Sequence, residues 1–461
     1  MVKREGKATG ARKTALKVLH EIDQGEAYAN IALKRVLDAK EWTKLDRGFI
    51  TEIIYGVVRN QKTLDWVLEQ QTRRPLAKTT AWVRNILRMA AYQILFMDKV
   101  PPSAATHQAV ELAKRYGHPG SVGFVNGVLR QLIREHDKLK YPDLDQEPVR
   151  HISIKYSHPE WLVERWLQRF GVDNTIALCQ IDNQPAPVTL RTNTLKTSRD
   201  ELIAVLADEG VTAEPGSLTP ESIRVTGLDH VEGLPSFVAG LFLVQDEASQ
   251  LVGHVLRPQP EQFVLDVCAA PGTKTTHLAQ LMQNKGRVIA WDVHPHKIAL
   301  IEGNCRRLGI TIVIASEGDA RELPHDLMGK VDALLLDVPC SGTGVLRRRA
   351  DSRWRKSPEA ILSLQQLQRE ILTGSVPGLK PGGILVYSTC SIEQEENLDN
   401  IQWTLQQFPE LKLQPLTPYL PNGFFRKEDL ETAAQGYLQL LPHVHGTDGF
   451  FVARMQRGSI E

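Results

Sequence analysis

Two cysteines stand at positions where a thiol could act as a nucleophile. Cys340 lies in LLLDVPCSGTG and Cys390 in LVYSTCSIEQEEN, and each follows a short apolar run that predicts a strand. If these strands belong to one parallel sheet, both cysteines emerge at its carboxyl edge, where a thiolate could attack a bound substrate. Cys179 and Cys305 lie within apolar helical patterns, so we expect both to be buried packing residues.

The segment LDVCAAPGTKTTHLAQLM, residues 265–282, predicts a cofactor-binding turn. An apolar strand ends at Asp266, small residues follow, and a helix is expected to begin near Thr273. A strand–turn–helix of this kind aims backbone N–H groups at a ligand, and small residues allow the ligand to approach the backbone. The segment lacks the GxGxxG pattern of NAD-binding proteins, so it favours another nucleoside cofactor.

Acidic residues end four successive predicted strands. They are Asp266, Asp292, Asp319 in the segment EGD, and Asp337. An acid at the end of the second strand, Asp292, suits the two hydroxyls of a ribose, and Asp319 is a candidate for an adenine edge. The alternative is a dinucleotide-type fold whose loop acids only face solvent. Four such positions together favour the nucleoside cofactor.

Basic residues are concentrated in two parts of the chain. Residues 1–140 contain 25 Lys and Arg against 14 Asp and Glu, whereas the remaining residues contain 30 against 40. The run LRRRADSRWRK, residues 346–356, directly follows the Cys340 segment. Arg can neutralise phosphates and Trp can stack on unpaired bases, so both parts favour RNA binding. The alternative is that these charges only solvate helix faces.

The pattern of apolar residues predicts a multidomain protein. Amphipathic helical runs fill residues 10–140, and a polar, proline-containing segment follows them. Residues 151–243 mix helical and alternating strand patterns, which predicts a small α+β insert. From Val244 onward, short apolar runs alternate with helical segments, as in a parallel sheet with helices on both faces. The expected domains are residues 1–140, 151–243 and 244–457.

The 461-residue chain has the composition of an ordinary globular protein, with 42% hydrophobic and 24% charged residues. No apolar run approaches the roughly 20 residues that cross a membrane, and the N-terminus shows no secretory signal. The five cysteines include no CxxC pair, so we expect free thiols in a reducing cytoplasm. We also expect no membrane partner, no metal site and a monomeric protein.

Three motifs in order make the chain resemble the NOL1/NOP2/Sun family of RNA cytosine-5 methyltransferases. They are DVCAAPGTKT, DVPCSGTGVLRR and YSTCS, and they lie between Val244 and Gln456. The N-terminal segments DRGFITEIIYGVVR and FVNGVLR resemble, more weakly, the RNA-binding domain of the antitermination factor NusB. The resemblance implies an all-α NusB-like N-terminal domain, a small α+β insert and a C-terminal α/β domain of the Rossmann-like class I methyltransferase fold.

This resemblance also implies a cofactor, a substrate and residue roles. The implied cofactor is S-adenosylmethionine, held by Cys268, Ala269, Ala270, Pro271, Gly272, Thr273, Lys274, Asp292, Asp319 and Asp337. Cys390 is implied to be the nucleophile, Cys340 to assist release of the methylated product, and Asp337 to contact the base. The implied substrate is a cytosine in RNA. The branch of the family that acts on 16S ribosomal RNA is the most similar, with tRNA as the alternative.

The sequence departs from the family pattern at two positions. Thr273 stands where the turn usually has a second glycine, and Val338 stands where the Pro-Cys loop usually has alanine. Thr273 would be strained if its position required a positive φ, but the first turn of a helix tolerates it, and we expect that geometry. We expect Val338 to add bulk next to the base pocket without removing a functional group.

The chemistry of cytosine explains why a thiol is needed. Carbon 5 is a weak nucleophile until a thiolate adds to carbon 6 and loads electron density onto carbon 5. The base must be unpaired or flipped out of its stack. The thiol must be partly ionised, and we expect the dipole of a helix following Cys390 to help. Asp337 would hold the amino and ring-nitrogen edge of the base.

Two other functions are compatible with parts of the sequence. DNA cytosine-5 methyltransferases also have a Pro-Cys loop, but there the Pro-Cys cysteine is the nucleophile, and Cys390 would have no role. A non-catalytic RNA-binding assembly factor with a degenerate methyltransferase fold would need only the helical region and the basic run. The intact DVCAAPGTK segment, Asp337 and both cysteines argue against it.

Overall fold

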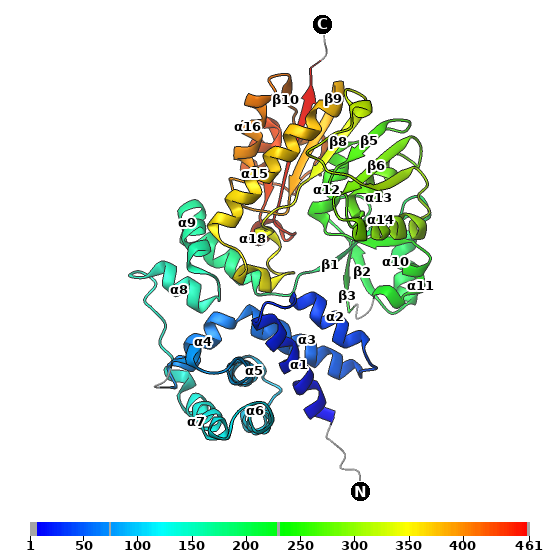
Figure 1. The fold of residues 1–461 in the computed structure, drawn as a ribbon. Coiled ribbons are helices and arrows are strands. Elements are labelled where there is room, and N and C mark those ends of the chain that lie inside the picture. The colour runs from blue at the N-terminus through cyan, green and yellow to red at the C-terminus, as the bar shows by residue number, and fades with distance from the viewer. Residues whose placement is uncertain (1–6, 73–74, 228–230, 459–461) are drawn as a thin grey trace. The chain divides into compact units, whose positions relative to one another are not determined.

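The computed structural model of the protein describes residues 7–72, 75–227 and 231–458. These residues form two compact units, which are described separately (Figure 1). The first unit consists of residues up to 185 together with 346–356, and the second of residues 186–345 together with those from 357 onward. The chain therefore leaves the second unit once, for a short segment that belongs to the first.

The first unit is built from helices. They are α1 (Lys7–Asp23), α2 (Ala29–Asp38), α3 (Lys44–Arg59), α4 (Gln61–Glu69), α5 (Ala81–Phe96), α6 (Pro102–Tyr116), α7 (Pro119–Glu135), α8 (Pro148–Lys155) and α9 (Glu160–Asp182), with short 3-10 turns η1 (Leu76–Lys78), η2 (His136–Lys138) and η6 (Ala350–Trp354). Thr43 and Thr80 cap α3 and α5, because each side chain accepts a hydrogen bond from the N–H three residues later. The prediction of an all-helical N-terminal domain is confirmed.

Apolar side chains at helical spacing form the core of this unit. Leu16, Ile50 and Leu87 are among the residues withdrawn from solvent. Helices α3 and α5 come especially close where Gly56 lies against the ring of Tyr92, because a Cβ atom at Gly56 would lie 2.0 Å from the ring atom Cζ. The close approach therefore requires glycine at this position of α3.

Helices α8 and α9 belong to the first unit. The second of them bends at Gly171, where φ is 76°. No helix in the described ranges is both long enough and apolar enough to cross a membrane. The two compact units are divided after residue 185, so α8 and α9 lie in the first unit and the strands that follow lie in the second. The predicted domains 1–140, 151–243 and 244–457 stay a prediction.

The basic run 346–356 is packed into the first unit. Arg353 is 1% exposed and donates hydrogen bonds to the carbonyl oxygens of Ser157 (3.0 Å) and Asp182 (3.1 Å). It also donates to Oδ1 of Asn183 (2.8 Å), so its guanidinium satisfies acceptors at the carboxyl end of α9. Arg347 is buried as well. The prediction that this run forms an RNA-binding surface is therefore wrong for Arg353, because its donors are used inside the protein, and Arg347 is withdrawn from solvent as well.

Other residues of the run make contacts of the same kind. Nε1 of Trp354 donates to the carbonyl oxygen of Val58 (3.2 Å), and the carboxylate of Asp351 accepts from the backbone N–H of Ala29 (3.0 Å). In contrast, the side chain of Arg349 is exposed. The mixture of Arg, Trp and Asp in this run thus serves the packing of the segment onto the helices.

The second unit contains an eight-stranded mixed sheet. Its path is β10-β12-β9-β8-β5-β6-β7, and β11 pairs with β12. The strands are β5 (Phe263–Asp266), β6 (Arg287–Asp292), β7 (Val313–Glu317), β8 (Val331–Asp337), β9 (Leu379–Thr389), β10 (Leu411–Leu413), β11 (Tyr437–Leu440) and β12 (Phe450–Arg457). The predicted parallel sheet is confirmed for β5 to β9, and β10, β11 and β12 extend it with antiparallel pairs.

Helices cover both faces of this sheet (Figure 1). On one face α12 (Glu247–Leu256), α13 (Thr273–Leu281), α14 (Pro295–Leu308) and α17 (Lys427–Gln435) share an apolar cluster with the strands. On the other face α15 (Pro358–Ser375) and α16 (Leu398–Gln407) do so. The remaining short elements are η4 (His325–Leu327), η5 (Thr343–Val345), η7 (Val376–Gly378), η8 (Thr417–Tyr419) and α18 (Pro442–His445).

A smaller antiparallel sheet of order β2-β3-β1-β4 belongs to the same unit. Its elements are β1 (Val188–Thr192), α10 (Arg199–Asp208), β2 (Thr212–Pro215), β3 (Ser222–Thr226), η3 (Val231–Gly233), α11 (Pro235–Val238) and β4 (Phe242–Val244). Ser198 and Glu201 form a capping box that starts α10. The expected α+β insert is therefore present.

Strand order places the candidate site. From β5 the chain proceeds to β6 and β7 on one side, and from β8 to β9 on the other. Ligands of open α/β sheets bind at the carboxyl ends of the strands where the order reverses in this way. Strands β5, β6 and β8 end at Asp266, Asp292 and Asp337, while Cys340 and Cys390 follow β8 and β9. The topology thus brings the predicted residues to one edge.

We expect Arg353→Ala to lower the free energy of unfolding by about 3 kcal/mol, because it leaves buried carbonyl oxygens without donors. The salt dependence of RNA binding should stay the same, since this guanidinium does not reach solvent. Chemical denaturation and RNA titrations of the full chain measure the two quantities. Arg349→Ala, at the exposed position of the same segment, is the matched control. Unchanged stability with a shallower salt slope for Arg353→Ala would restore the RNA-contact interpretation.

Candidate functional site

Cys340 and Cys390 lie close together at the carboxyl edge of the large sheet. Asp337, the last residue of β8, pairs in register with Ser388 of β9, and the two cysteines lie just beyond these positions. The Sγ atoms of Cys340 and Cys390 are 3.3 Å apart, and both residues are partly exposed. A single planar base could therefore contact both sulfurs.

The surroundings of Cys340 favour its thiol form. The hydrogen bond with Cys390 and burial raise the pKa of Cys340 well above its usual value. The carboxylates of Glu396 and Asp337 contribute to the same increase in this pKa. A protonated Cys340 can donate to the sulfur of Cys390 and so stabilise negative charge there. The pair therefore suits a thiolate at Cys390 beside a thiol at Cys340.

The helix dipole expected to assist Cys390 is not in place, so that prediction is wrong. The next helix, α16, begins only at Leu398, and residues 391–397 form a loop. Side chains hold this loop: Thr389 Oγ1 donates to Oδ1 of Asn397 (2.6 Å), and Nδ2 of Asn397 donates to the carbonyl oxygen of Ser391 (2.9 Å). These local hydrogen bonds compete successfully with helix formation.

The turn after β5 has the geometry of a ligand-binding loop. Gly272 takes a left-handed conformation with φ of 92°, and Thr273 is the first residue of α13, so the expected first-turn geometry is confirmed. The N–H of Ala269 donates to the carbonyl oxygen of Trp291 (2.7 Å), which holds the turn against β6. No side chain caps α13, so its first N–H groups can bind a ligand.

Arg191 of β1 supports this turn from the small sheet. Its buried guanidinium donates to the carbonyl oxygen of Thr273 (2.6 Å) and to Oγ1 of Thr276 (3.0 Å), and it also bonds to Gln245. Burial lowers the pKa of Arg191 to about 9. Sequence reasoning missed this residue, because VTLRTN has the alternation of an ordinary strand. The one feature of the sequence that could have indicated its role is that Arg191 occupies a position of the predicted strand that faces the protein interior.

One ion pair links the turn to the strands that carry the cysteines. Nζ of Lys274 lies 2.7 Å from Oδ2 of Asp337, and Oγ of Ser388 donates to Oδ1 of Asp337 (2.8 Å). The Lys274 ammonium also lies 5.0 Å from the centre of the Phe450 ring. A continuous polar path therefore runs from the predicted cofactor turn to the end of β9, two residues before Cys390.

Asp266 carries a carboxylate oxygen without a partner. The residue is 1% exposed; Oδ2 accepts from Oγ1 of Thr275 (2.7 Å), whereas Oδ1 is buried and lacks a hydrogen bond of good geometry, although the backbone N–H of Cys268 is close enough to act against the rise in the pKa of Asp266. Burial raises the pKa of Asp266 to about 7, and the charge of Asp337 adds to the effect. An orphaned carboxylate oxygen beside the turn fits a cationic group such as the ammonium of S-adenosylmethionine. The sequence placed Asp266 at a strand end but gave it no role.

Asp292 ends β6 as predicted, whereas Asp319 lies two residues beyond the end of β7, and the cofactor contacts of both stay predictions. Oδ1 of Asp292 accepts from the N–H of His294 (2.9 Å) and lies 3.6 Å from Nζ of Lys297. Both carboxylate oxygens of Asp319 pair with the guanidinium of Arg321, and Nη2 of Arg321 lies 2.7 Å from Oδ2 of Asp319. A ligand at Asp319 would therefore compete with that arginine.

Three other cysteines and Val338 are accounted for by packing. Cys179 and Cys305 are buried, as predicted. Burial raises the pKa of Cys268 well above its usual value, so its thiol is unsuited to nucleophilic attack. Val338 packs in the apolar cluster beneath the sheet. The expectation that Val338 adds bulk to the base pocket is wrong, because its side chain faces the core.

Glu221, His254 and His277 form the one cluster, within the described part of the chain, with a spacing that could hold a metal ion. Nε2 of His277 and of His254 lie 2.7 and 2.8 Å from Oε1 of Glu221. Two ligands of a tetrahedral zinc ion would lie about 3.3 Å apart, so the three groups sit closer together than zinc ligands would. His254 makes a hydrogen bond to Glu221, whereas the contact of His277 Nε2 is an ion-pair distance without hydrogen-bond geometry. Nδ1 of His277 also lacks the acceptor that metal-binding histidines usually have. We interpret the cluster as a link between the small sheet and α12 and α13.

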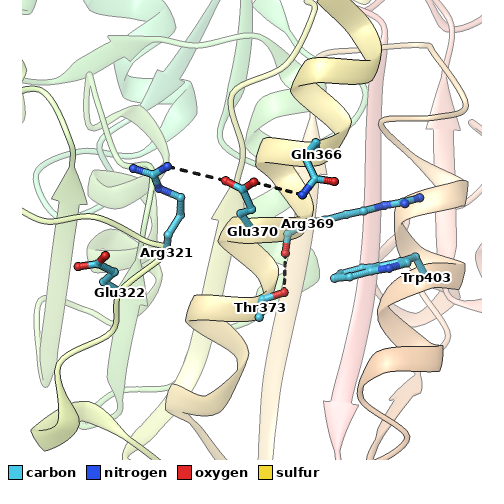
Figure 2. Close-up of a pocket in the computed structure, with 7 residues that line it drawn as sticks. All are labelled: Arg321, Glu322, Gln366, Arg369, Glu370, Thr373 and Trp403. Atoms are coloured by element: carbon cyan, nitrogen blue, oxygen red, sulfur yellow. Dashed lines mark hydrogen bonds and ion pairs between the residues drawn. The ribbon is translucent and has the colours of Figure 1, made fainter.

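A hollow of about 450 Å³ lies elsewhere on the second unit, over α15 and α16 (Figure 2). Its lining residues are Arg321, Glu322, Gln366, Arg369, Glu370, Thr373 and Trp403. Figure 2 shows the Glu370 carboxylate between Arg321 (3.7 Å) and Gln366 (3.1 Å). The hollow contains none of the predicted site residues, and its Arg321 and Glu370 pair with each other, so it is not the candidate active site.

Comparison with protein families gives matches in both units. Residues 253–456 match the family described as 16S rRNA methyltransferase RsmB/F. Residues 9–134 match the NusB family, and residues 158–232 match the ferredoxin-like domain of RsmF/B-like methyltransferases. These matches follow the helical part, the small sheet and the large sheet in chain order.

Similar proteins extend over nearly the whole chain. A Bacillus subtilis (strain 168) protein named "Probable ribosomal RNA small subunit methyltransferase B" is 39% identical, over 98% of this chain and 99% of that protein. The crystal structure of PH0851 has a TM-score of 0.80 at 30% identity, covering 96% of this chain and 98% of that one. The structure of NSun6 from Pyrococcus horikoshii with SFG has a TM-score of 0.58 at 25% identity, covering 66% and 99%.

We expect the affinity for S-adenosylmethionine to rise with pH through about 7, where Asp266 loses its proton. Below that pH the neutral carboxyl cannot pair with the ammonium, so affinity should fall by up to about tenfold per pH unit. Asp266→Asn should weaken binding and remove this pH dependence, as measured by calorimetric titration on both sides of neutrality. Asp292→Asn is the control and should weaken binding but keep the slope. A slope that survives in Asp266→Asn would exclude Asp266 as its source.

Proposed function

Because the chain belongs to the 16S rRNA methyltransferase RsmB/F family, we propose that it methylates carbon 5 of a cytosine in 16S ribosomal RNA, with S-adenosylmethionine as the methyl donor. The observation that carries the proposal is the 3.3 Å separation between the sulfurs of Cys340 and Cys390. The ion pair between Lys274 and Asp337 joins this thiol pair to the turn that would hold the donor.

The chain offers a suitable group to each part of S-adenosylmethionine. The backbone of residues 268–274 and the free oxygen of Asp266 would hold the methionine end. Asp292 would bind the ribose hydroxyls, and Asp319 would contact the adenine. When bound, the cofactor supplies an electrophilic methyl group. The similar structure of NSun6 was solved with SFG, which supports a cofactor of this class.

In the proposed mechanism, Cys390 adds to carbon 6 of an unpaired cytosine. The new S–C bond removes the 5,6 double bond and places electron density on carbon 5. Asp337 is held by Lys274 and Ser388 at the same edge and can accept a hydrogen bond from the amino group of the base. That contact orients the ring and stabilises charge that develops on addition.

Release reverses the addition. Once carbon 5 carries the methyl group, a base removes the proton that remains there. The electron pair re-forms the double bond, and the bond to Cys390 breaks with its electrons returning to sulfur. Cys340, kept as a thiol by its raised pKa and 3.3 Å from the departing sulfur, can donate a hydrogen bond that assists departure.

RNA is the favoured substrate class. The NusB-like region supports an RNA partner, and the relative from B. subtilis is named for small-subunit ribosomal RNA. A DNA-type mechanism would leave Cys390 unused, although its sulfur contacts that of Cys340. Transfer to tRNA is the runner-up and is separated by substrate comparison. We further propose that the protein acts as a monomer in the cytoplasm, where its five free cysteines would remain reduced.

Cys390→Ala is expected to reduce methyl transfer by roughly a thousandfold or more, because no other group forms the carbon-6 adduct. Binding of S-adenosylmethionine should change by less than about twofold, since the turn residues are untouched. Labelled-methyl transfer to 16S rRNA, tRNA and DNA, followed by bisulfite sequencing of the product, measures both the loss and the substrate. Cys305→Ala removes a buried thiol on α14 and serves as the control. Turnover by Cys390→Ala would refute its role.

Cys340→Ala is expected to trap enzyme and RNA as a covalent adduct, because addition can proceed while departure of Cys390 loses its hydrogen-bond donor. A denaturing gel with labelled RNA should show a slow band for this variant. The double variant Cys340→Ala with Cys390→Ala should lose that band. If the single variant forms no adduct, or the double variant keeps one, then the roles given to the two cysteines are wrong.

A further inference from the structure

A buried carboxylate, Glu396, lies in the loop between β9 and α16, close to both cysteines. Burial raises the pKa of Glu396, since a carboxylate is costly to remove from water unless its oxygens are well paired. The mechanism proposed above gives it no chemical step, and the sequence showed it only as one of several acids in SIEQEEN. Its contacts indicate what it does.

Both oxygens of this carboxylate accept hydrogen bonds from neutral donors. Oε1 accepts from the backbone N–H of Ser341 (2.7 Å) and from Nε2 of Gln368 (3.1 Å). Oε2 accepts from the hydroxyls of Ser391 (2.5 Å) and Ser341. Ser341 directly follows Cys340, and Ser391 directly follows Cys390. The carboxylate therefore joins the residues next to the two cysteines.

The two loops differ in how firmly the sheet holds them. Cys390 comes immediately after β9, a strand paired on both sides. Cys340 lies three positions beyond the end of β8, before Gly342, whose φ is 69°. In addition to the hydrogen bonds of Glu396, Nε2 of Gln368 donates a hydrogen bond to the carbonyl oxygen of Pro339 in this loop (2.9 Å). A backbone hydrogen bond from the N–H of Gly344 to the carbonyl oxygen of Cys390 (3.0 Å) also joins the loops, but it lies beyond Cys340, so these side chains support the part of the loop next to Cys340.

We propose that Glu396 is a positioning residue that clamps the Cys340 loop onto the Cys390 loop, so that both sulfurs reach the same base. The inference rests on the function proposed above. Addition to carbon 6 needs only Cys390, whereas release uses Cys340 as well. Loss of the clamp should therefore slow release more than addition, and the covalent intermediate should accumulate.

A residue that only stabilised the fold would behave differently. Its loss would lower the amount of folded enzyme, but each folded molecule would partition between free and covalent RNA as before. The fraction of RNA-bound enzyme that is covalent therefore separates the two roles. This fraction is measured on denaturing gels, and the folded fraction is measured by titration with S-adenosylmethionine.

The central test compares Glu396→Ala with Glu396→Gln in the full chain. Glu396→Ala removes all four hydrogen bonds, so kcat should fall by about tenfold to a hundredfold while KM for RNA and cofactor stay within about threefold. The covalent fraction should rise several-fold. Glu396→Gln keeps an acceptor towards the Ser341 N–H and Gln368, and its amide can donate to the two hydroxyls, so it should recover most of the lost kcat.

Asp332→Ala is the matched control. Asp332 is a partly buried carboxylate that accepts from the N–H of Phe263 (2.8 Å), but it lies at the opposite end of β8 from the cysteines. Its loss should leave the covalent fraction unchanged. The proposal is overturned if Glu396→Ala lowers activity without raising the covalent fraction, or if Glu396→Gln is as impaired as Glu396→Ala.

A milder variant covers the case in which Glu396→Ala does not fold. Ser341→Ala removes one hydroxyl of the clamp and keeps the backbone bond, so it should raise the covalent fraction in the same direction by a smaller factor. An unchanged covalent fraction in that variant would also overturn the proposal. Wild-type enzyme decides the underlying function separately: if it neither methylates RNA nor forms an adduct through Cys390, the proposed function fails whatever the Glu396 variants show.

Discussion

The parallel pairing of β8 with β9 sets where Asp337 and the two cysteine loops lie. The register places Asp337 beside Ser388, and the two cysteine loops start from these neighbours. Both strands are buried, and Leu336 and Tyr387 face the same apolar cluster. A slip of one residue would turn these side chains to the opposite face of the sheet, so core packing holds the register. The register that fixes where both cysteine loops begin is therefore set by apolar residues that take no part in the chemistry.

Support for the cofactor side comes from the small sheet. Arg191 holds the first turn of α13, and Glu221 joins the histidines of α12 and α13. None of these residues was expected at the site, yet they fix the helix whose N-terminus would face the donor. A buried cation at Arg191 is tolerated because backbone and side-chain oxygens surround it. The α+β insert thus holds α13 of the catalytic domain in place.

The strands, their carboxyl ends and the two cysteines could be predicted from the sequence, because apolar runs and the polar turns that end them are local properties. Sequence patterns failed where a side chain's partner lies far along the chain. The basic run around Arg353 looked like an RNA surface, since burial against α9 leaves no mark in the run itself. The helix expected after Cys390 is a loop, because Thr389 and Asn397 bond to each other. Arg191 and Glu396 were missed for the same reason: each acts through residues that only the fold brings near.

The return of residues 346–356 to the helical unit has a consequence for how the protein is made. On the ribosome, the chain up to residue 185 emerges long before this segment does. At that stage the helical core lacks Ala350. The carbonyl oxygen of Asp182 at the carboxyl end of α9 also lacks the hydrogen bond that Arg353 donates in the folded protein. The helical unit reaches its final packing only after β8 has been synthesised. Expressed as an N-terminal fragment, it would lack part of its own interior.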